Sequence, residues 1–303
     1  MTITSWHRGI GADITSDMTI DEQLEVAGLN WKVATSEIKY GDNFNLQSNY
    51  RKAIYRTDNG QLLDTAGKNW QPYQNRDLLQ VFHSFTDVVS LKIDHLGSLD
   101  NGRVIFAGAN LNIELDIAKV GDIVRGRILL FNFHKVGFGL QVRLQFERLI
   151  CTNGMTQPVK VGSRSITHIG RFNPGKVEKI LQSALNNAKQ FEQNSELLAN
   201  TTMSHEQATM LLINEFGNPQ LPVDQQPTIV DTCLRLFAGN ARGSDMLSAY
   251  NTAWGLLNSV TEYFNHHSQI RGGSSTHLNS LLIGSKANKQ EQFYQQLVSL
   301  SWR

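Results

Sequence analysis

Apolar and polar residues alternate one by one along much of the first half of the chain, most clearly between Phe138 and Phe146. Five apolar residues there alternate with Gly139, Gln141, Arg143 and Gln145. Because a strand points successive side chains to opposite faces, this pattern predicts a strand with one buried face and one wet, partly basic face. The preceding apolar run, from Asp122 to Phe133, is its predicted antiparallel partner. The two strands form the centre of the predicted sheet.

Two Asp-Asn-Gly tripeptides, at 58–60 and 100–102, separate further runs of strand type. Asn and Gly both tolerate positive φ, so these tripeptides predict tight hairpins, the first between 50–57 and 61–63 and the second between 91–93 and 103–106. A short helix is expected to end at Gly28, with a first strand at 29–33. Asn75 is the expected N-cap of another helix, whose apolar side carries Leu78 and Phe82.

After residue 173 the apolar spacing changes to the 3.6-residue period of helices. Pro174 is expected at the start of one helix, and Ser204 with Gln207 forms a predicted capping box for the next. The longest helix is predicted from Asp245 to Phe264. The fold class is therefore α+β, with an N-terminal antiparallel sheet of consecutive hairpins and short helices, followed by a helical C-terminal half. We predict a hairpin-rich domain at 1–170 and a helical region at 171–303 that packs on it or mediates assembly.

Composition and charge narrow the class of protein. The 303 residues are 40% hydrophobic and 18% charged, with a formal net charge of +1, so any affinity for nucleic acid must come from local patches. Two cysteines are too few for a disulfide scaffold. The N-terminus lacks the apolar segment of a signal peptide, and no apolar run approaches the length of a membrane span. These features predict a soluble, cytoplasmic protein.

Catalytic and cofactor motifs are not recognisable in the sequence. The Gly137–Gly139 turn lacks the third glycine of a dinucleotide-binding loop, and His205-Glu206 lacks the second histidine of a zinc-protease helix. We therefore expect no cofactor, no metal ligands and no enzymatic activity. One alternative stays open: a nuclease would need converging carboxylates on a metal ion. The candidates for these lie near turns and are Asp58, Asp64, Asp94 and Asp100.

Basic and aromatic residues recur together on the predicted strands. Cations neutralise phosphates and aromatic rings stack on bases, so this mixture is typical of proteins that hold single-stranded nucleic acid. The alternative is that the aromatic residues belong to the core and the bases only solubilise the sheet. The candidate nucleic-acid-binding residues are Arg51, Lys52, Tyr55, Arg56, Lys68, Trp70, Tyr73, Arg125, Arg127, His134, Lys135, Arg143, Arg164, His168 and Arg171.

A series of short motifs resembles a phage- and plasmid-associated bacterial family, domain of unknown function 932. The motifs occur in the family's order along nearly the whole chain, and they include Trp6-His7-x-Gly9-Ile10-Gly11, Ala27–Trp31, Tyr73–Asn75, Leu96–Arg103, Asn132–His134 and Arg148–Gly154. The resemblance implies a phage or plasmid context in a bacterial host cell. Hairpins followed by helices are also similar to ring-forming single-strand annealing proteins of the phage Red beta type, which is an analogy of fold only.

From these patterns we expect a non-enzymatic protein that binds single-stranded DNA in phage or plasmid recombination or replication, including annealing, and that associates with itself. The alternative is a phage structural or protein-interaction protein without nucleic-acid binding.

Overall fold

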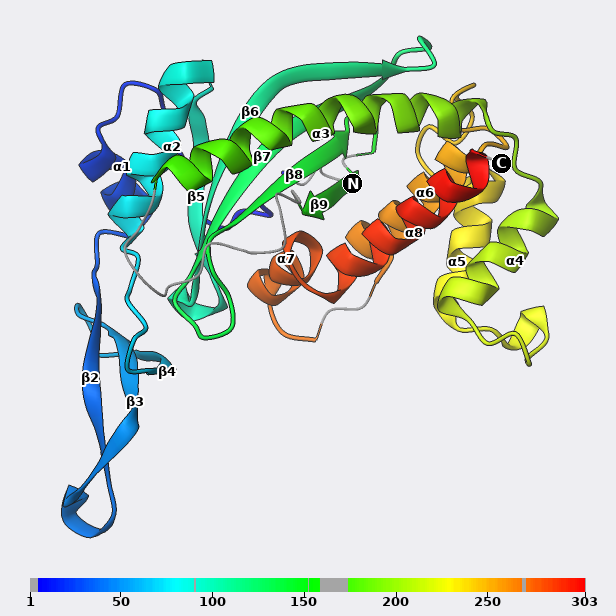
Figure 1. The fold of residues 1–303 in the computed structure, drawn as a ribbon. Coiled ribbons are helices and arrows are strands. Elements are labelled where there is room, and N and C mark those ends of the chain that lie inside the picture. Colours follow the sequence, from blue (N-terminus) through cyan, green and yellow to red (C-terminus); the bar gives the residue numbers. More distant parts are fainter. Residues whose placement is uncertain (1–4, 90, 152, 159–173, 269–270, 303) are drawn as a thin grey trace.

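The structure, a computed structural model, describes residues 5–89, 91–151, 153–158, 174–268 and 271–302. In this part of the chain a six-stranded antiparallel sheet has the strand order β1-β5-β6-β7-β8-β9, and a separate three-stranded sheet has the order β2-β3-β4. The strands of the large sheet are β1 (Ala12–Asp13), β5 (Ile93–Leu99), β6 (Val104–Ile117), β7 (Asp122–Phe133), β8 (Gln141–Arg148) and β9 (Asn153–Pro158). Those of the small sheet are β2 (Val33–Tyr40), β3 (Leu46–Arg56) and β4 (Leu62–Gly67). Figure 1 shows the small sheet projecting from the body, at the opposite end from α4 and α5.

Both predicted Asp-Asn-Gly hairpins are confirmed. The first joins β3 to β4, and Gly60 has φ +71°. The second joins β5 to β6 through a short 3-10 turn, in which Asn101 has φ +53° and Gly102 has φ +85°. These left-handed conformations explain why Asn and Gly occupy the turns. The expected strand at 29–33 is wrong in its position, because β2 starts only at Val33.

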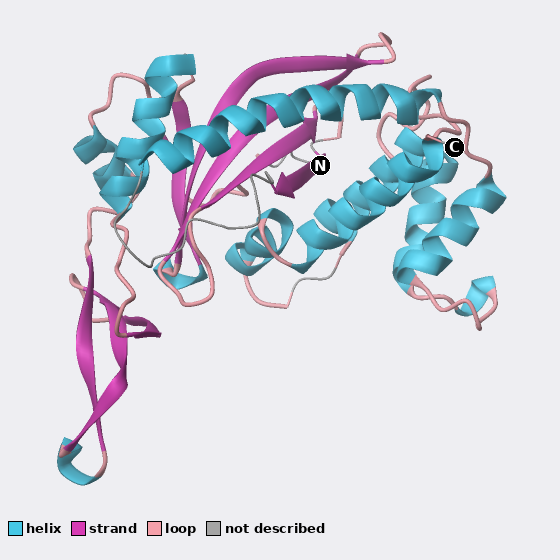
Figure 2. Ribbon diagram, viewed as in Figure 1, coloured by secondary structure: helices cyan, strands magenta, loops and turns pink. Residues whose placement is uncertain are grey.

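Helices cover the large sheet from both sides, as Figure 2 shows for the long α3 (Pro174–Asn200). On one face Phe146 of β8 stacks on Phe191 of α3, with ring centroids 3.6 Å apart. On the other face Phe131 and Phe133 share a second apolar cluster with α7 (Ser274–Leu282). The predicted wet face of β8 is therefore wrong, since Arg143 and Gln145 are buried.

The second half of the chain is helical, as predicted. Its remaining helices are α4 (His205–Phe216), α5 (Thr228–Arg235), α6 (Ala253–Glu262) and α8 (Ser285–Ser301), while the first half contains α1 (Ile20–Val26) and α2 (Asn75–Val89). The capping box at Ser204 and the helix start at Pro174 are confirmed. The predicted helix from Asp245 to Phe264 is confirmed only from Ala253 onward, because Asn251 has φ +50° and the Thr252 side chain caps the helix that starts at Ala253. The longest helix is α3 instead.

The α+β fold class is thus confirmed. The predicted boundary near residue 170 lies outside the described residues, and the division into two domains stays a prediction. Within the described ranges, no helix combines the length and the apolar character needed to cross a membrane.

A buried ion pair joins the sheet to the helical half. The carboxylate of Asp122, at the start of β7, accepts hydrogen bonds from Arg148 Nε at 2.6 Å and Arg148 Nη2 at 2.8 Å. It also accepts from Ser248 Oγ at 2.6 Å and Trp254 Nε1 at 3.0 Å, both from the helical half. Arg148 donates in turn to the carbonyl of Gly243 at 3.0 Å. Each charge is therefore fully compensated although both side chains are buried.

Replacing Asp122 by Asn should destabilise the fold strongly, because it leaves the Arg148 guanidinium buried without its counter-ion. Losing one partner of a buried pair costs about 3–5 kcal/mol. Urea denaturation followed by circular dichroism measures the loss. Asp231→Asn is the control: it removes an exposed pair with Arg235, 3.0 Å apart, which contributes less than about 1 kcal/mol. Equal unfolding midpoints for the two variants would contradict this account.

Candidate nucleic-acid interface

The small sheet and its flanks, residues 32–68, form a projecting arm, called the arm from here on (Figure 1). Three of its aromatic side chains are largely exposed: Tyr40 at 52%, Phe44 at 72% and Tyr50 at 84%. Tyr55 lies nearer the base of the arm and is half-buried. Large aromatic side chains are normally buried, so their concentration on one projecting element marks a contact surface.

The backbone near the tip of the arm holds these rings outward. The β2–β3 pairing is irregular between Glu37 and Lys39, and Ser48 Oγ there accepts hydrogen bonds from the backbone N–H groups of Tyr50 (3.4 Å) and Arg51 (3.1 Å). At the tip Phe44 has φ +55°, a left-handed conformation that costs a bulky residue about 1–2 kcal/mol. A strained, exposed phenylalanine contributes nothing to the core, which favours a role in contact.

The arm also concentrates basic charge. It contains six basic and four acidic residues, a net charge of +2, while the rest of the chain sums to −1. Lys39, Lys52 and Lys68 have no ion-pair partner among the described residues. Arg51 donates from Nε to Thr65 Oγ1 at 3.0 Å, so its charge is not neutralised either. Arg56 differs, because it pairs with Asp58 at 2.7 Å and lies 4.2 Å from the centre of the Trp31 ring.

Hydrogen bonds fix the base of the arm to the body. Arg103 Nε donates to the carbonyl of Leu63 at 2.6 Å, and the backbone N–H of Val136 donates to Asp64 Oδ2 at 2.8 Å. Val33 N donates to the side chain of Gln74 at 2.9 Å, and that side chain donates back to Val33 O at 3.0 Å. The arm is thus mounted on loops and strands of the large sheet.

A buried polar network lies beneath this mounting. Asn75 Nδ2 donates to the carbonyls of Leu29 (2.9 Å) and Trp31 (3.3 Å), and Asn75 Oδ1 lies 2.8 Å from His134 Nε2. Asn132 Nδ2 donates to Tyr73 O at 2.9 Å. Asn75 is consequently a core residue within the first turn of α2, and its predicted N-cap role is wrong. Residues 27–31, 73–75 and 132–134, three of the motif segments that carried the family resemblance, meet at this network.

Several predicted binding residues belong to this interior. Trp70, Tyr73 and His134 are buried, so as placed here they have no face open to a base. Arg143 is also buried and donates to the carbonyl of Leu282 at 3.0 Å. Their burial favours the alternative interpretation of these residues, in which they serve the core.

The remaining basic residues of the large sheet are paired with acids. Arg125 lies 2.7 Å from Glu114, Arg127 pairs with Asp94, and Lys135 lies 3.5 Å from Asp100. These residues therefore do not form an open basic surface along the large sheet. The four aspartates considered for a nuclease site have separate partners. Asp94 pairs with Arg127, Asp100 with Lys135 and Asp58 with Arg56. Asp64 accepts a hydrogen bond from the backbone N–H of Val136. Arg164, His168 and Arg171 lie outside the described residues.

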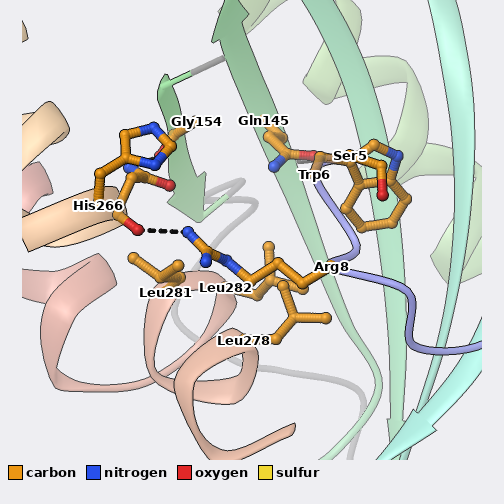
Figure 3. A pocket seen from close by; sticks show the side chains of 10 residues that line it. Ser5, Trp6, Arg8, Gln145, Gly154, His266, Leu278, Leu281 and Leu282 are labelled. Carbon is orange, nitrogen blue, oxygen red and sulfur yellow. Dashed lines mark hydrogen bonds between the residues drawn. The ribbon is translucent and has the colours of Figure 1, made fainter. Parts of the chain in front are cut away.

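A small cavity lies where the N-terminal segment passes between β8, β9 and α7 (Figure 3). It is lined by Trp6, Arg8, Gln145 and His266, among others, and measures about 10 Å³, room for at most one water molecule. The Arg8 guanidinium donates to the backbone carbonyl of Asn265, and burial lowers the pKa of Arg8. The hydrogen bond of Arg8 anchors the N-terminal segment, and the cavity beside it is too small to bind a substrate.

A cluster of possible metal ligands lies nearby. Within the described residues, the ligand atoms of His7, Asp13 and His95 all lie within 4.8 Å of one another. The rings of His7 and His95 are stacked with centroids 3.7 Å apart, and Asp13 Oδ1 lies 2.9 Å from His95 Nδ1. His7 and Asp13 belong to the N-terminal segment and His95 follows Asp13 by 82 residues, so their sequence spacing gave no signal.

A family model matches residues 62–292, and its description is "Domain of unknown function (DUF932)". The chain belongs to this family. The DUF932 match begins at the first residue of β4, so most of the arm, His7 and Asp13 lie on its N-terminal side. A search of curated proteins and a search of solved structures each gave no significant match. The predicted family is confirmed, while its association with phages and plasmids stays a prediction.

Proposed function

We propose that this DUF932 protein binds single-stranded DNA without enzymatic action, in phage or plasmid recombination or replication, and that the arm is its main contact surface. The observation that carries the proposal is the exposure of Tyr40, Phe44 and Tyr50 beside lysines that have no ion-pair partner in the described part of the chain. Single-stranded DNA offers bases for stacking and phosphates for ion pairing, and the arm offers both complements.

The location of the charge supports this assignment. A net charge of +1 gives the whole molecule no general attraction for a polyanion, so binding requires a local basic element. The basic residues of the large sheet are buried or paired, whereas Lys39, Arg51, Lys52 and Lys68 of the arm form no ion pair with any residue that the structure describes. Hydrogen bonds at the base of the arm also attach it to the body, and ordering of a contact surface before binding lowers the entropy lost when DNA binds.

Removing an exposed ring from the arm should weaken DNA binding. Each stacked base contributes about 1–3 kcal/mol, so Tyr50→Ala should raise the Kd for a labelled oligothymidylate about 5- to 150-fold, as measured by fluorescence anisotropy. Tyr250→Ala is the matched control, since Tyr250 is 64% exposed and lies outside the arm. A Kd unchanged in Tyr50→Ala, Phe44→Ala and their double variant would exclude stacking on the arm.

The salt dependence of binding tests the cations separately from the rings. Each phosphate contact on a single strand contributes a slope of about −0.7 to the plot of log affinity against log salt concentration. Replacing Lys39, Lys52 and Lys68 together by Gln should therefore make the slope shallower by about 2. A control variant with Gln at the exposed residues Lys179, Lys189 and Lys289 changes the net charge equally. If the salt-dependence slope becomes shallower by the same amount in both triple variants, the arm is not the phosphate-binding element.

A second candidate function is assembly through the arm without nucleic-acid binding. β2 is an edge strand of the small sheet, and Tyr40 and Leu46, paired near the tip, are both exposed. An open edge with apolar side chains can pair with a strand of another copy. Light scattering of the wild type and of Phe44→Ala distinguishes the two functions. If the wild type forms a defined oligomer and does not bind DNA, and Phe44→Ala loses that oligomer, the result favours assembly.

A further inference from the structure

We propose that the turn between β7 and β8, residues 134–140, carries a second stacking site for an unpaired nucleobase, formed by the ring of Phe138. The inference rests on the proposed binding of single-stranded DNA, and it extends the contact surface from the arm to the body of the molecule. The ligand is a base with a free face, as a single strand provides, because a base inside a duplex is stacked on both sides.

The Phe138 ring is supported from one side and open on the other. Phe138 is 46% exposed, whereas Phe133, at the end of β7, is 1% exposed and belongs to the apolar cluster shared with α7. The two rings are stacked, with centroids 5.1 Å apart and planes 21° apart. Because Phe133 covers one face of the Phe138 ring, the exposed part of that ring includes the opposite face. A base can stack on a ring that is held in this way.

A surplus of positive charge lies beside the ring. Lys135 Nζ is 4.9 Å from the centre of the Phe138 ring. The carboxylate of Asp100, 3.5 Å from Lys135 Nζ, also pairs with Arg103 at 3.6 Å. One carboxylate neutralises only one of these two cations, and the Arg103 side chain is 44% exposed. The turn therefore combines an open aromatic face with positive charge that can meet the phosphate next to a stacked base.

The turn is continuous with the base of the arm. The backbone N–H of Val136 donates to Asp64 Oδ2 of β4 at 2.8 Å, at the end of the large sheet nearest the arm (Figure 1). Leu62, the first residue of β4, pairs with Tyr55 of β3, so their side chains lie on the same face of the small sheet. Leu62 is 54% and Val136 is 40% exposed. A single strand that leaves the arm can therefore reach Phe138 over exposed apolar side chains.

The rival explanation for Phe138 is packing alone, in which the ring shields Phe133 and contacts no ligand. Shielding requires only an apolar side chain of similar size, so leucine can replace phenylalanine at a small cost in stability. Stacking requires an aromatic face, which leucine lacks and tyrosine retains. Substitutions at Phe138 consequently separate the two roles.

Fluorescence anisotropy with a labelled oligothymidylate tests the site. Phe138→Leu should raise the Kd about fivefold or more, because one stacked base is lost, while the Tm stays close to that of the wild type. Phe138→Tyr should bind with nearly the wild-type Kd. The matched control is Tyr250→Leu, which removes a ring that is 64% exposed and lies outside both surfaces, and it should leave the Kd unchanged.

Photo-crosslinking with an oligonucleotide that contains 5-iodouracil, followed by mass spectrometry, identifies the contacted rings directly. A crosslink at Phe138 supports the proposal. A wild-type Kd in Phe138→Leu, with crosslinks only on Tyr40, Phe44 or Tyr50, overturns it and leaves the arm as the DNA-binding surface. A crosslink at Phe138 with none on the arm overturns the role of the arm instead. If the wild type does not bind the oligonucleotide at all, both proposals are overturned.

Discussion

The buried contact between Asp122 and Arg148 holds the two halves of this molecule together. Asp122 opens β7 and Arg148 ends β8, so the pair closes one end of the central hairpin. The same carboxylate accepts from Ser248 and Trp254, more than a hundred residues away. A buried carboxylate needs all of these donors, and only one placement of the helices against the sheet supplies them. These bonds orient α6 and the loop before it, together with apolar contacts such as that of Trp254 with Phe191.

The sequence predicted those parts of the fold that depend on local physics. Asn-Gly turns, a capping box and a proline at a helix start act within a few residues, and each was found in place. What covers a strand is decided by segments far away in the chain. Arg143 has the spacing of a solvent-facing residue, yet α7 supplies the carbonyl that it binds. Alternation therefore revealed the strand but not its environment.

The same distinction explains which parts of the candidate site were predictable. Arg51, Lys52 and Tyr55 were recognised because basic and aromatic residues interleave along β3. Tyr40, Phe44 and Tyr50 were not singled out as the exposed rings, because exposure on a projecting sheet follows from the absence of covering elements, which no local pattern encodes. The cluster of His7, Asp13 and His95 depends on a close approach at Gly11. That approach joins residues 82 positions apart, so the sequence gave no signal of it.

The pairing of the arginines in the large sheet and the lack of pairing at the arm lysines Lys39, Lys52 and Lys68, within the described residues, have one physical origin. A guanidinium within a packed sheet loses its hydration and must find a carboxylate, as Arg127 does with Asp94, or a carbonyl, as Arg143 does. Lysines on a thin three-stranded arm stay hydrated and need no partner. The lysines of the arm are thus among the cations that remain available to a polyanion. Hydrogen bonds at Leu63, Asp64 and Val33 attach the base of the arm to the body and so set the direction in which its charges project.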